Sequence, residues 1–282
     1  MTIFFDRLKD KYGNFELVRL TGGFTNAAYL LKGTDPPFVA KVAKLASQDI
    51  ENECHSLRFL ANQTITPKLI DRYIFEKTQV VIMTFEPGAN GQSILDTNDL
   101  ARAEKVFTNM GLCLAEKIHS FRFDGQTHEI REGNLPFLSF DLDFVPFELR
   151  VESRTLLNKL EVKRDEWVLT HGDFGSHNVL FADGEPLTVI DWEWTEWFHP
   201  LVDIAWACWN TQLHYPKMAD RLNHALIESY QSRRPFVLDP ETLKALVLYK
   251  LWNILMKVRD ADGETKQKWV NRLQWTFENK WI

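Results

Sequence analysis

The stretch that decides the fold of this chain reads His-Gly-Asp-Phe-Gly-Ser-His-Asn at residues 171–178 and Val-Ile-Asp-Trp-Glu at residues 189–193. Asp173 precedes Asn178 by five positions, and Asn178 precedes Asp191 by thirteen. Phosphoryl transfer from ATP uses a carboxylate that orients the attacking hydroxyl, together with an amide oxygen and a second carboxylate that hold metal ions. These three side chains supply one group of each kind, so the stretch is interpreted as a catalytic loop followed by a metal ligand.

The sequence between Asn178 and Asp191 predicts a β-hairpin. Two short apolar runs, residues 178–181 and 187–190, are separated by an Asp-Gly pair at residues 183–184. Short strands joined by such a pair are typical of a hairpin. The hairpin would carry Asn178 at its entry and Asp191 at its exit, so we expect both side chains to converge on one metal site.

The same spacing of Asp, Asn and a downstream metal-binding Asp occurs in protein kinases. A loop rich in Gly, Asp, Ser and Asn is ordinary by itself, but here it reads His-Gly-Asp where protein kinases have His-Arg-Asp. This variant resembles the aminoglycoside phosphotransferase and choline kinase superfamily, whose members phosphorylate small molecules. The resemblance covers residues 16–88 and 165–206. It implies an α+β, protein-kinase-like bilobal fold, with an antiparallel-sheet nucleotide-binding lobe over residues 1–86 and a mainly helical catalytic and acceptor-binding lobe over residues 87–282.

A glycine pair lies in the expected N-terminal lobe, between two strands predicted at residues 16–20 and 27–31. Adjacent glycines let backbone N–H groups approach phosphate oxygens, although a Gly-Gly turn is also a common hairpin signal. No Gly-Lys-Ser/Thr follows, which excludes a Walker A loop. The order Gly-Gly-x-Thr-Asn resembles the nucleotide loop of choline-kinase-like enzymes, and this resemblance implies four ATP-binding residues: Gly22, Gly23, Thr25 and Asn26.

Lys41 interrupts the apolar pattern of a third strand, at residues 38–42. An ammonium group inside such a strand is costly unless it meets anions. The resemblance implies that Lys41 binds the ATP phosphates and that Glu53, on a helix expected at residues 47–62, pairs with it. The alternatives on the same two elements are Lys44 and Glu51.

Two more strands are predicted at residues 68–75 and 79–84, and Pro87 and Gly88 then end the strand pattern. The resemblance implies that this segment is the hinge that binds adenine, with Met83 and Phe85 flanking the base. The alternative is that these two side chains are simply core residues.

The rest of the chain is mostly helical. Helical spacing of apolar residues predicts helices at about residues 99–121, 147–161, 200–213, 217–233, 240–260 and 263–279. Residues 122–146 form a connection without clear periodicity, which is often functional or mobile. The resemblance implies structural roles near the catalytic loop for His119, His171 and Asp203.

Composition agrees with a globular protein and excludes several classes of partner. The 282 residues are 45% hydrophobic and 26% charged, which is typical of globular chains. A net charge of −6 argues against nucleic-acid binding. Lys250 and Lys257 interrupt the longest apolar run, so no membrane span is expected. Three scattered cysteines and the lack of a signal-peptide core favour a reducing, cytoplasmic location.

The residues that bind the acceptor are the part of the site that the sequence determines least. Residues 192–198 combine three tryptophans with Glu193 and Glu196, and carboxylates beside indole rings can hold an ammonium group. We therefore expect Glu193 and Glu196 to bind a cationic acceptor, while the individual tryptophans are better explained by packing. Glu193 lies two residues after Asp191, so it is also expected near the metal.

The sequence as a whole indicates an ATP- and Mg²⁺-dependent phosphotransferase that acts on a hydroxyl of a small, cationic molecule, either an aminoglycoside-like antibiotic or a choline- or thiamine-type metabolite. One alternative is a catalytically silent nucleotide-binding regulatory protein on the same fold. The hypothesis that the chain is a protein-serine kinase is weakened by the missing loop arginine and by the lack of an Ala-Pro-Glu segment after Asp191.

Overall fold

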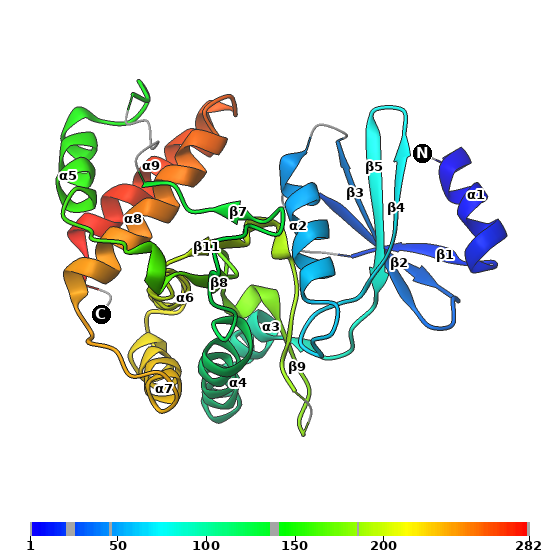
Figure 1. Cartoon of the computed structure of the whole chain (residues 1–282), viewed down its shortest axis with the longest axis horizontal. Coiled ribbons are helices and arrows are strands. Elements are labelled where there is room, and N and C mark those ends of the chain that lie inside the picture. The colour runs from blue at the N-terminus through cyan, green and yellow to red at the C-terminus, as the bar shows by residue number, and fades with distance from the viewer. Residues whose placement is uncertain (1, 21–25, 45–46, 136–140, 185, 281–282) are drawn as a thin grey trace. The chain divides into compact units, whose positions relative to one another are not determined.

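The chain is described here by a computed structural model that covers residues 2–20, 26–44, 47–135, 141–184 and 186–280 (Figure 1). It divides into two compact units. The first comprises Met1–Ala89 and Leu180–Trp194, and the second comprises Asn90–Val179 and Thr195–Ile282. By this division, the first unit ends at residue 89 and also includes residues 180–194; the lobe boundary expected after residue 86 stays a prediction.

The first unit contains a five-stranded antiparallel sheet. Its strand order is β1-β2-β3-β5-β4, with β1 (Glu16–Arg19), β2 (Ala27–Lys32), β3 (Phe38–Lys44), β4 (Leu69–Phe75) and β5 (Thr78–Thr84). This arrangement confirms the expected antiparallel-sheet N-terminal region. In the central strand β3, Lys41 lies opposite Ala28 of β2 and Val81 of β5, so it is surrounded by sheet.

Two helices accompany this sheet. The first, α1 (Thr2–Tyr12), was not anticipated from the sequence, and its side chains Phe5 and Leu8 join a core cluster built from the sheet. The second, α2 (Gln48–Phe59), lies within the helix expected at residues 47–62; it buries Ile50, Cys54 and Leu57 and carries Glu53 on a buried face.

Residues 180–194 belong to the first unit through contacts of their own. The Val189 amide donates a hydrogen bond to the Ile65 carbonyl at 2.7 Å, and the 3₁₀ turn η5 (Trp192–Trp194) packs against α2. The predicted hairpin is present as β9 (Val179–Phe181) and β10 (Thr188–Val189), in a small sheet of order β10-β9-β6 with β6 (Ala89–Asn90).

The second unit is mainly helical, as expected. Its α-helices are α3 (Gly91–Asp96), α4 (Leu100–Cys113), α5 (Phe147–Leu157), α6 (Leu201–His214), α7 (Ala219–Gln231), α8 (Pro240–Lys257) and α9 (Gly263–Glu278). Short 3₁₀ turns occur at η3 (Arg164–Glu166) and η4 (Ser176–Asn178), and a small sheet joins β7 (Arg131–Glu132), β11 (Glu196–Phe198) and β8 (Val168–Thr170). Nearly every side chain of α6 from residue 201 to 209 is buried, which identifies α6 as a central helix of this unit.

One helix departs from its predicted course. The helix expected over residues 99–121 is α-helical only to Cys113 and continues as a π-helical turn, η1 (Leu114–Ile118). The His119 amide closes this turn on the Leu114 carbonyl at 2.8 Å. The wider turn rotates the following side chains, and His119 thereby meets Asp203 of α6 at 3.1 Å.

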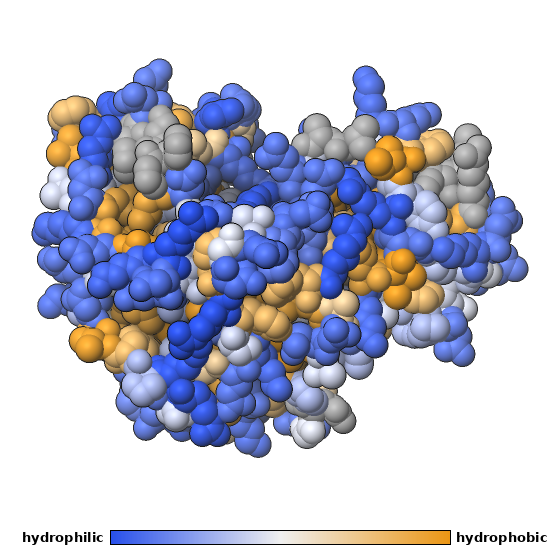
Figure 2. Space-filling model, in the orientation of Figure 1, coloured by the Kyte–Doolittle hydropathy of each residue, from blue (hydrophilic) through white to orange (hydrophobic). Residues whose placement is uncertain are grey.

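Polar and apolar residues share the visible face of the molecule unequally. Figure 2 shows a face dominated by hydrophilic residues, with hydrophobic ones in scattered patches. The exposed large apolar side chains include Ile74, Phe147 and Val237. Within the described ranges, no helix is both long and apolar enough to cross a membrane.

The contact between α4 and α7 generates a stability prediction. A Cβ atom added at Gly111 of α4 would overlap Ser229 Oγ and the Leu226 carbonyl oxygen of α7, whereas one added at Gly263 would meet nothing within 4 Å. Because the Leu226 obstacle is backbone, Gly111→Ala should lower the free energy of unfolding by about 1–3 kcal/mol. Urea denaturation measures this, with Gly263→Ala as the matched control that should not destabilise. Equal stability of Gly111→Ala and the unmodified chain would contradict this packing.

Candidate active site

Lys41 is the centre of a buried charge cluster in the first unit. Its Nζ atom lies 2.7 Å from Glu53 Oε2, 2.7 Å from Asp191 Oδ1 and 3.6 Å from Glu193 Oε2. Burial by itself would lower the pKa of the Lys41 ammonium, but the three carboxylates raise it well above its usual value. Lys41 is therefore a fixed positive charge, and Lys44 and Glu51 have no part in this cluster.

The cluster contains more negative than positive charge. Burial raises the pKa of Glu53 to about 7, and Asp191 and Glu193 act in the same direction, while Lys41 opposes them. The side chain of Asp191 is 37% exposed, whereas those of Glu53 and Glu193 are 2% and 5% exposed. Asp191 is thus the carboxylate of this cluster that a ligand from solvent can reach.

The backbone at Asp191 is also unusual. Asp191 has a φ of 65°, a left-handed conformation that residues other than glycine seldom adopt. Such conformations cost of order 1–3 kcal/mol and cluster at functional sites. The hydrogen bond from Trp192 Nε1 to the Val189 carbonyl, 2.8 Å long, fixes the chain on either side of Asp191.

Glu193 is held by two asparagines of the first unit. Asn26 Nδ2 donates to Glu193 Oε2 at 3.0 Å, and Asn52 Nδ2 donates to the Glu193 carbonyl oxygen at 3.2 Å. Asn26 therefore joins the Lys41 cluster through Glu193. The other predicted nucleotide-loop residues, Gly22, Gly23 and Thr25, lie outside the described residues.

The two predicted adenine neighbours differ in exposure. Met83 of β5 is 7% exposed and pairs with Val39 in the sheet, while Phe85 is 37% exposed and follows the end of β5. Met83 is thus largely a core residue, and Phe85 is accessible to a ligand. Their contact with adenine stays a prediction.

Asp173 lies in the second unit, in a network of hydrogen bonds. Its Oδ1 atom accepts from Trp206 Nε1 at 2.7 Å, and its Oδ2 atom accepts from Asn178 Nδ2 at 3.1 Å. Burial would raise the pKa of this carboxyl, but His177, Lys250 and His171 hold it below its usual value. Asp173 is therefore an ionised, oriented hydrogen-bond acceptor.

Asn178 is oriented by Asp173 itself. Its Nδ2 atom also donates to the Asp173 carbonyl oxygen at 2.9 Å. Because the amide nitrogen is directed at Asp173, the amide oxygen is the remaining polar atom of Asn178, and this is the ligand type that Mg²⁺ takes.

Asp203 holds the backbone of the loop that contains Asp173. Its two carboxylate oxygens accept hydrogen bonds from the amides of His171 and Gly172, both at 2.8 Å. His119 Nε2 lies 3.1 Å from the same carboxylate. These contacts agree with the structural roles expected for His119, His171 and Asp203.

Lys250 and Trp206 were not identified from the sequence as site residues. Lys250 of α8 is 3% exposed, and its Nζ atom lies 5.7 Å from the centre of the Trp206 ring. Burial lowers the pKa of Lys250 to about 8, while Asp173 and Glu196 raise it. The signal in the sequence was a lysine within the apolar pattern of residues 240–257, which by itself indicates only that this run does not span a membrane.

Glu196 and Glu193 lie in different units. Glu196 Oε2 accepts a hydrogen bond from Tyr249 Oη at 2.8 Å, and burial raises the pKa of Glu196 to about 7. Binding of the acceptor by these two glutamates stays a prediction. Trp192 and Trp197 are 0% and 1% exposed, which confirms the interpretation that these two tryptophans serve packing.

Among the described residues, no group of three or more His, Cys, Asp or Glu forms a ready cage for a metal ion. Mg²⁺ needs no such cage in a nucleotide site, because one or two side-chain ligands together with phosphates and water complete its octahedron. The donor types of Asp191 and Asn178 fit this ion.

The antiparallel sheet of the first unit and the helical second unit have the α+β, protein-kinase-like fold that the sequence predicted. The profile of the Phosphotransferase enzyme family matches residues 16–236. The chain therefore belongs to that family.

Solved structures of antibiotic phosphotransferases are similar to this chain in fold. One is a thermostable mutant of the aminoglycoside phosphotransferase APH(4)-Ia in a ternary complex with AMP-PNP and hygromycin B, with a TM-score of 0.73 and 17% identity over 99% of this chain and 98% of that chain. Another is the spectinomycin phosphotransferase APH(9)-Ia with ADP and spectinomycin, with a TM-score of 0.66 and 16% identity over 98% of this chain and 93% of that chain.

A curated relative, acyl-CoA dehydrogenase family member 11 of Gallus gallus, is 38% identical over 68 residues, which are 22% of this chain and 9% of that protein. The match thus covers only a small part of that relative.

The raised pKa of Glu196 predicts a pH-dependent stability. Between the usual value of 4.5 and about 7, the folded chain holds a proton that the unfolded chain has released. The protonated Glu196 therefore adds to the free energy of unfolding. This contribution is complete below pH 4.5 and is lost as the pH rises through 7. Glu196→Gln cannot ionise, so its stability relative to the unmodified chain should be greater at pH 8 than at pH 4, by roughly 1–3 kcal/mol. Denaturant titrations at both pH values measure this, and a pH-independent difference would contradict it.

Proposed function

We propose that this chain transfers the γ-phosphate of ATP to a hydroxyl group of a small molecule, with Mg²⁺ as cofactor. The observation that carries the proposal is the pair of networks around Lys41 and Asp173. One supplies a fixed cation and an accessible carboxylate, and the other supplies an oriented, ionised acceptor. Phosphoryl transfer requires this division into phosphate binding and hydroxyl orientation.

On the nucleotide side, Lys41 would bind phosphate oxygens, as a compact and permanently charged ammonium group. Gly22, Gly23, Thr25 and Asn26 would add backbone and side-chain donors, Met83 and Phe85 would contact adenine, and Glu53 would keep Lys41 in place. Mg²⁺ would be held by Asp191 and Asn178, and when bound it would neutralise charge on the phosphates.

On the acceptor side, Asp173 would accept a hydrogen bond from the substrate hydroxyl. Its lowered pKa is compatible with this role, since a loose transition state does not require a strong base. The donors Trp206 Nε1 and Asn178 Nδ2 fix both carboxylate oxygens. Orientation of the hydroxyl is therefore the main contribution that we assign to Asp173.

The acceptor is proposed to be small and cationic. Glu196 supplies a carboxylate in the second unit, and the net charge of −6 favours cations at long range. Hygromycin B and spectinomycin, which are present in the structures of two similar proteins, are candidates of the antibiotic class. Choline- and thiamine-type metabolites are the other candidates.

A catalytically silent, nucleotide-binding regulatory protein is the second candidate function. It would need Lys41 and Asp191 but not an oriented Asp173. The three hydrogen bonds that link Asp173 and its carbonyl to Trp206 and Asn178 favour the enzyme.

An ATP-consumption screen tests the proposal. The acceptors are aminoglycosides, macrolides, choline, ethanolamine, thiamine, methylthioribose and homoserine. Once the acceptor is known, Asp173→Asn should lower kcat by ~10²–10⁴-fold or more. The neutral amide has one acceptor oxygen instead of two, so it cannot accept from Trp206 Nε1 and Asn178 Nδ2 on separate oxygens and orient the hydroxyl as well. Calorimetry should show unchanged affinity for a non-hydrolysable ATP analogue.

The matched control is Asp143→Asn, at an exposed aspartate of the second unit, which should keep full turnover. Near-normal turnover by a folded Asp173→Asn variant would refute the assignment. A silent protein would consume no ATP with any acceptor while still binding the analogue.

A further inference from the structure

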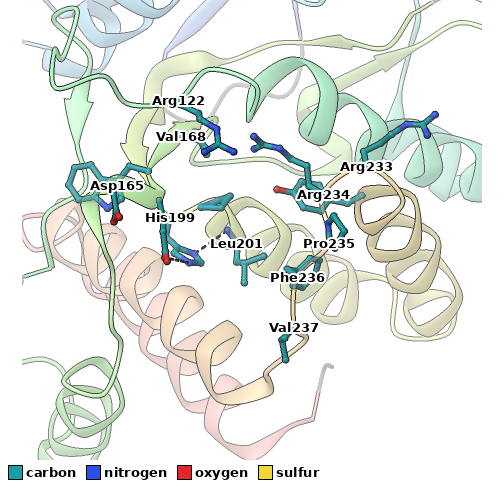
Figure 3. A pocket seen from close by; sticks show the side chains of 14 residues that line it. Arg122, Asp165, Val168, His199, Leu201, Arg233, Arg234, Pro235, Phe236 and Val237 are labelled. Atoms are coloured by element: carbon teal, nitrogen blue, oxygen red, sulfur yellow. Dashed lines mark hydrogen bonds and ion pairs between the residues drawn. The ribbon is translucent and has the colours of Figure 1, made fainter.

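The second unit contains a cavity away from the candidate active site. No residue with a proposed role in catalysis or nucleotide binding lines it. Its volume is about 610 Å³, within the range of small-molecule sites. Its walls come from five places in the chain, shown in Figure 3: Arg122, residues 165–168, residues 199–201, Tyr230 and residues 233–237.

Two arginines face one another in this cavity. The guanidinium groups of Arg122 and Arg234 point toward each other in Figure 3. Across the described part of the chain, neither forms an ion pair with a carboxylate, whereas Arg233, which also lines the cavity, pairs with Glu116. Two cations that converge without a counter-ion repel each other, and an anion between them would remove this repulsion.

The opposite side of the cavity is acidic. Asp165 lies apart from the two guanidinium groups, beside His199 in Figure 3, and Glu166 Oε2 is 3.9 Å from His199 Nε2. Burial lowers the pKa of His199 to about 4, so this histidine is neutral near pH 7 and does not offset the two carboxylates. A ligand would therefore need an anionic end at the arginines and an uncharged, hydrogen-bonding remainder at the acidic side.

We propose that this cavity binds a small phosphate ester whose remainder is neutral and hydroxylated. The planar forks of two guanidinium groups match the oxygens of a phosphate in bidentate fashion. Hydroxyl groups would donate to the Asp165 and Glu166 carboxylates, and the Trp167 and Phe236 rings supply apolar wall. This assignment is independent of the proposed transfer reaction.

The cavity is connected to the loop that contains Asp173. Tyr230 lines the cavity, and its hydroxyl lies 2.9 Å from Nδ1 of His119. Nε2 of His119 lies 3.1 Å from the Asp203 carboxylate, which holds the amides of His171 and Gly172. The Arg234 amide donates a hydrogen bond to the Tyr230 carbonyl at 2.9 Å, so a ligand on Arg234 would sit at the end of a short hydrogen-bonded chain that leads to the catalytic loop.

Calorimetric titration of the full chain tests the proposal with three probes: ribose 5-phosphate, inorganic phosphate and ribose. Ribose 5-phosphate should bind saturably and ribose should not. Arg122→Gln and Arg234→Gln should each weaken binding by about tenfold or more, because each removes a charge-assisted bidentate contact. Arg122 is exposed, so its variant should fold.

Two controls separate this cavity from other phosphate sites. Arg259→Gln removes an exposed arginine outside the cavity, and an excess of a non-hydrolysable ATP analogue occupies the nucleotide site proposed at Lys41, so neither should change the affinity for ribose 5-phosphate. The proposal is overturned if ribose 5-phosphate does not bind, if the Arg122 and Arg234 variants bind it as the unmodified chain does, if the ATP analogue displaces it, or if inorganic phosphate binds as tightly as the ester.

Discussion

A single buried ammonium group, that of Lys41, is the charge on which the candidate active site of the first unit depends. It is placed by the central strand of the sheet and is in contact with carboxylates from α2 and from the segment that follows β10. Removal of such an ammonium would leave several carboxylates without compensation, and breaking a buried pair costs about 3–5 kcal/mol. The same cluster carries more negative than positive charge, so it can accept a divalent cation at its exposed member, Asp191.

The second unit holds the loop that contains Asp173 in one conformation. Asp203 accepts two backbone amides at the start of the loop, and Trp206, one turn further along α6, fixes the carboxylate of Asp173. A central, buried α6 is thus able to orient both the backbone and the side chain of the loop. Lys250 extends this arrangement from α8, since its charge lies over the Trp206 ring and lowers the pKa of Asp173.

Much of this organisation could be predicted from the sequence because it is local. The spacing of Asp173, Asn178 and Asp191 identified the loop and hairpin, and alternating apolar residues identified the strand of Lys41. The contributions of Trp206 and Lys250 could not be predicted, since they come from helices whose packing is not encoded in short-range patterns. The π-turn before His119 was missed for the same reason: it brings His119 to Asp203, which lies 84 residues away in the sequence. The helix α1 was missed because its apolar residues are covered only when the sheet has formed.

The Mg²⁺ dependence of nucleotide binding tests the central claim most directly. Calorimetry with a non-hydrolysable ATP analogue, with and without Mg²⁺, would compare the unmodified chain with Asp191→Asn, which keeps the shape of the side chain and removes its charge. Mg²⁺ should strengthen binding to the unmodified chain, and Asp191→Asn should lose most of that gain, because the accessible carboxylate of the Lys41 cluster is the proposed metal ligand. An equal Mg²⁺-dependent gain in both proteins would contradict the account.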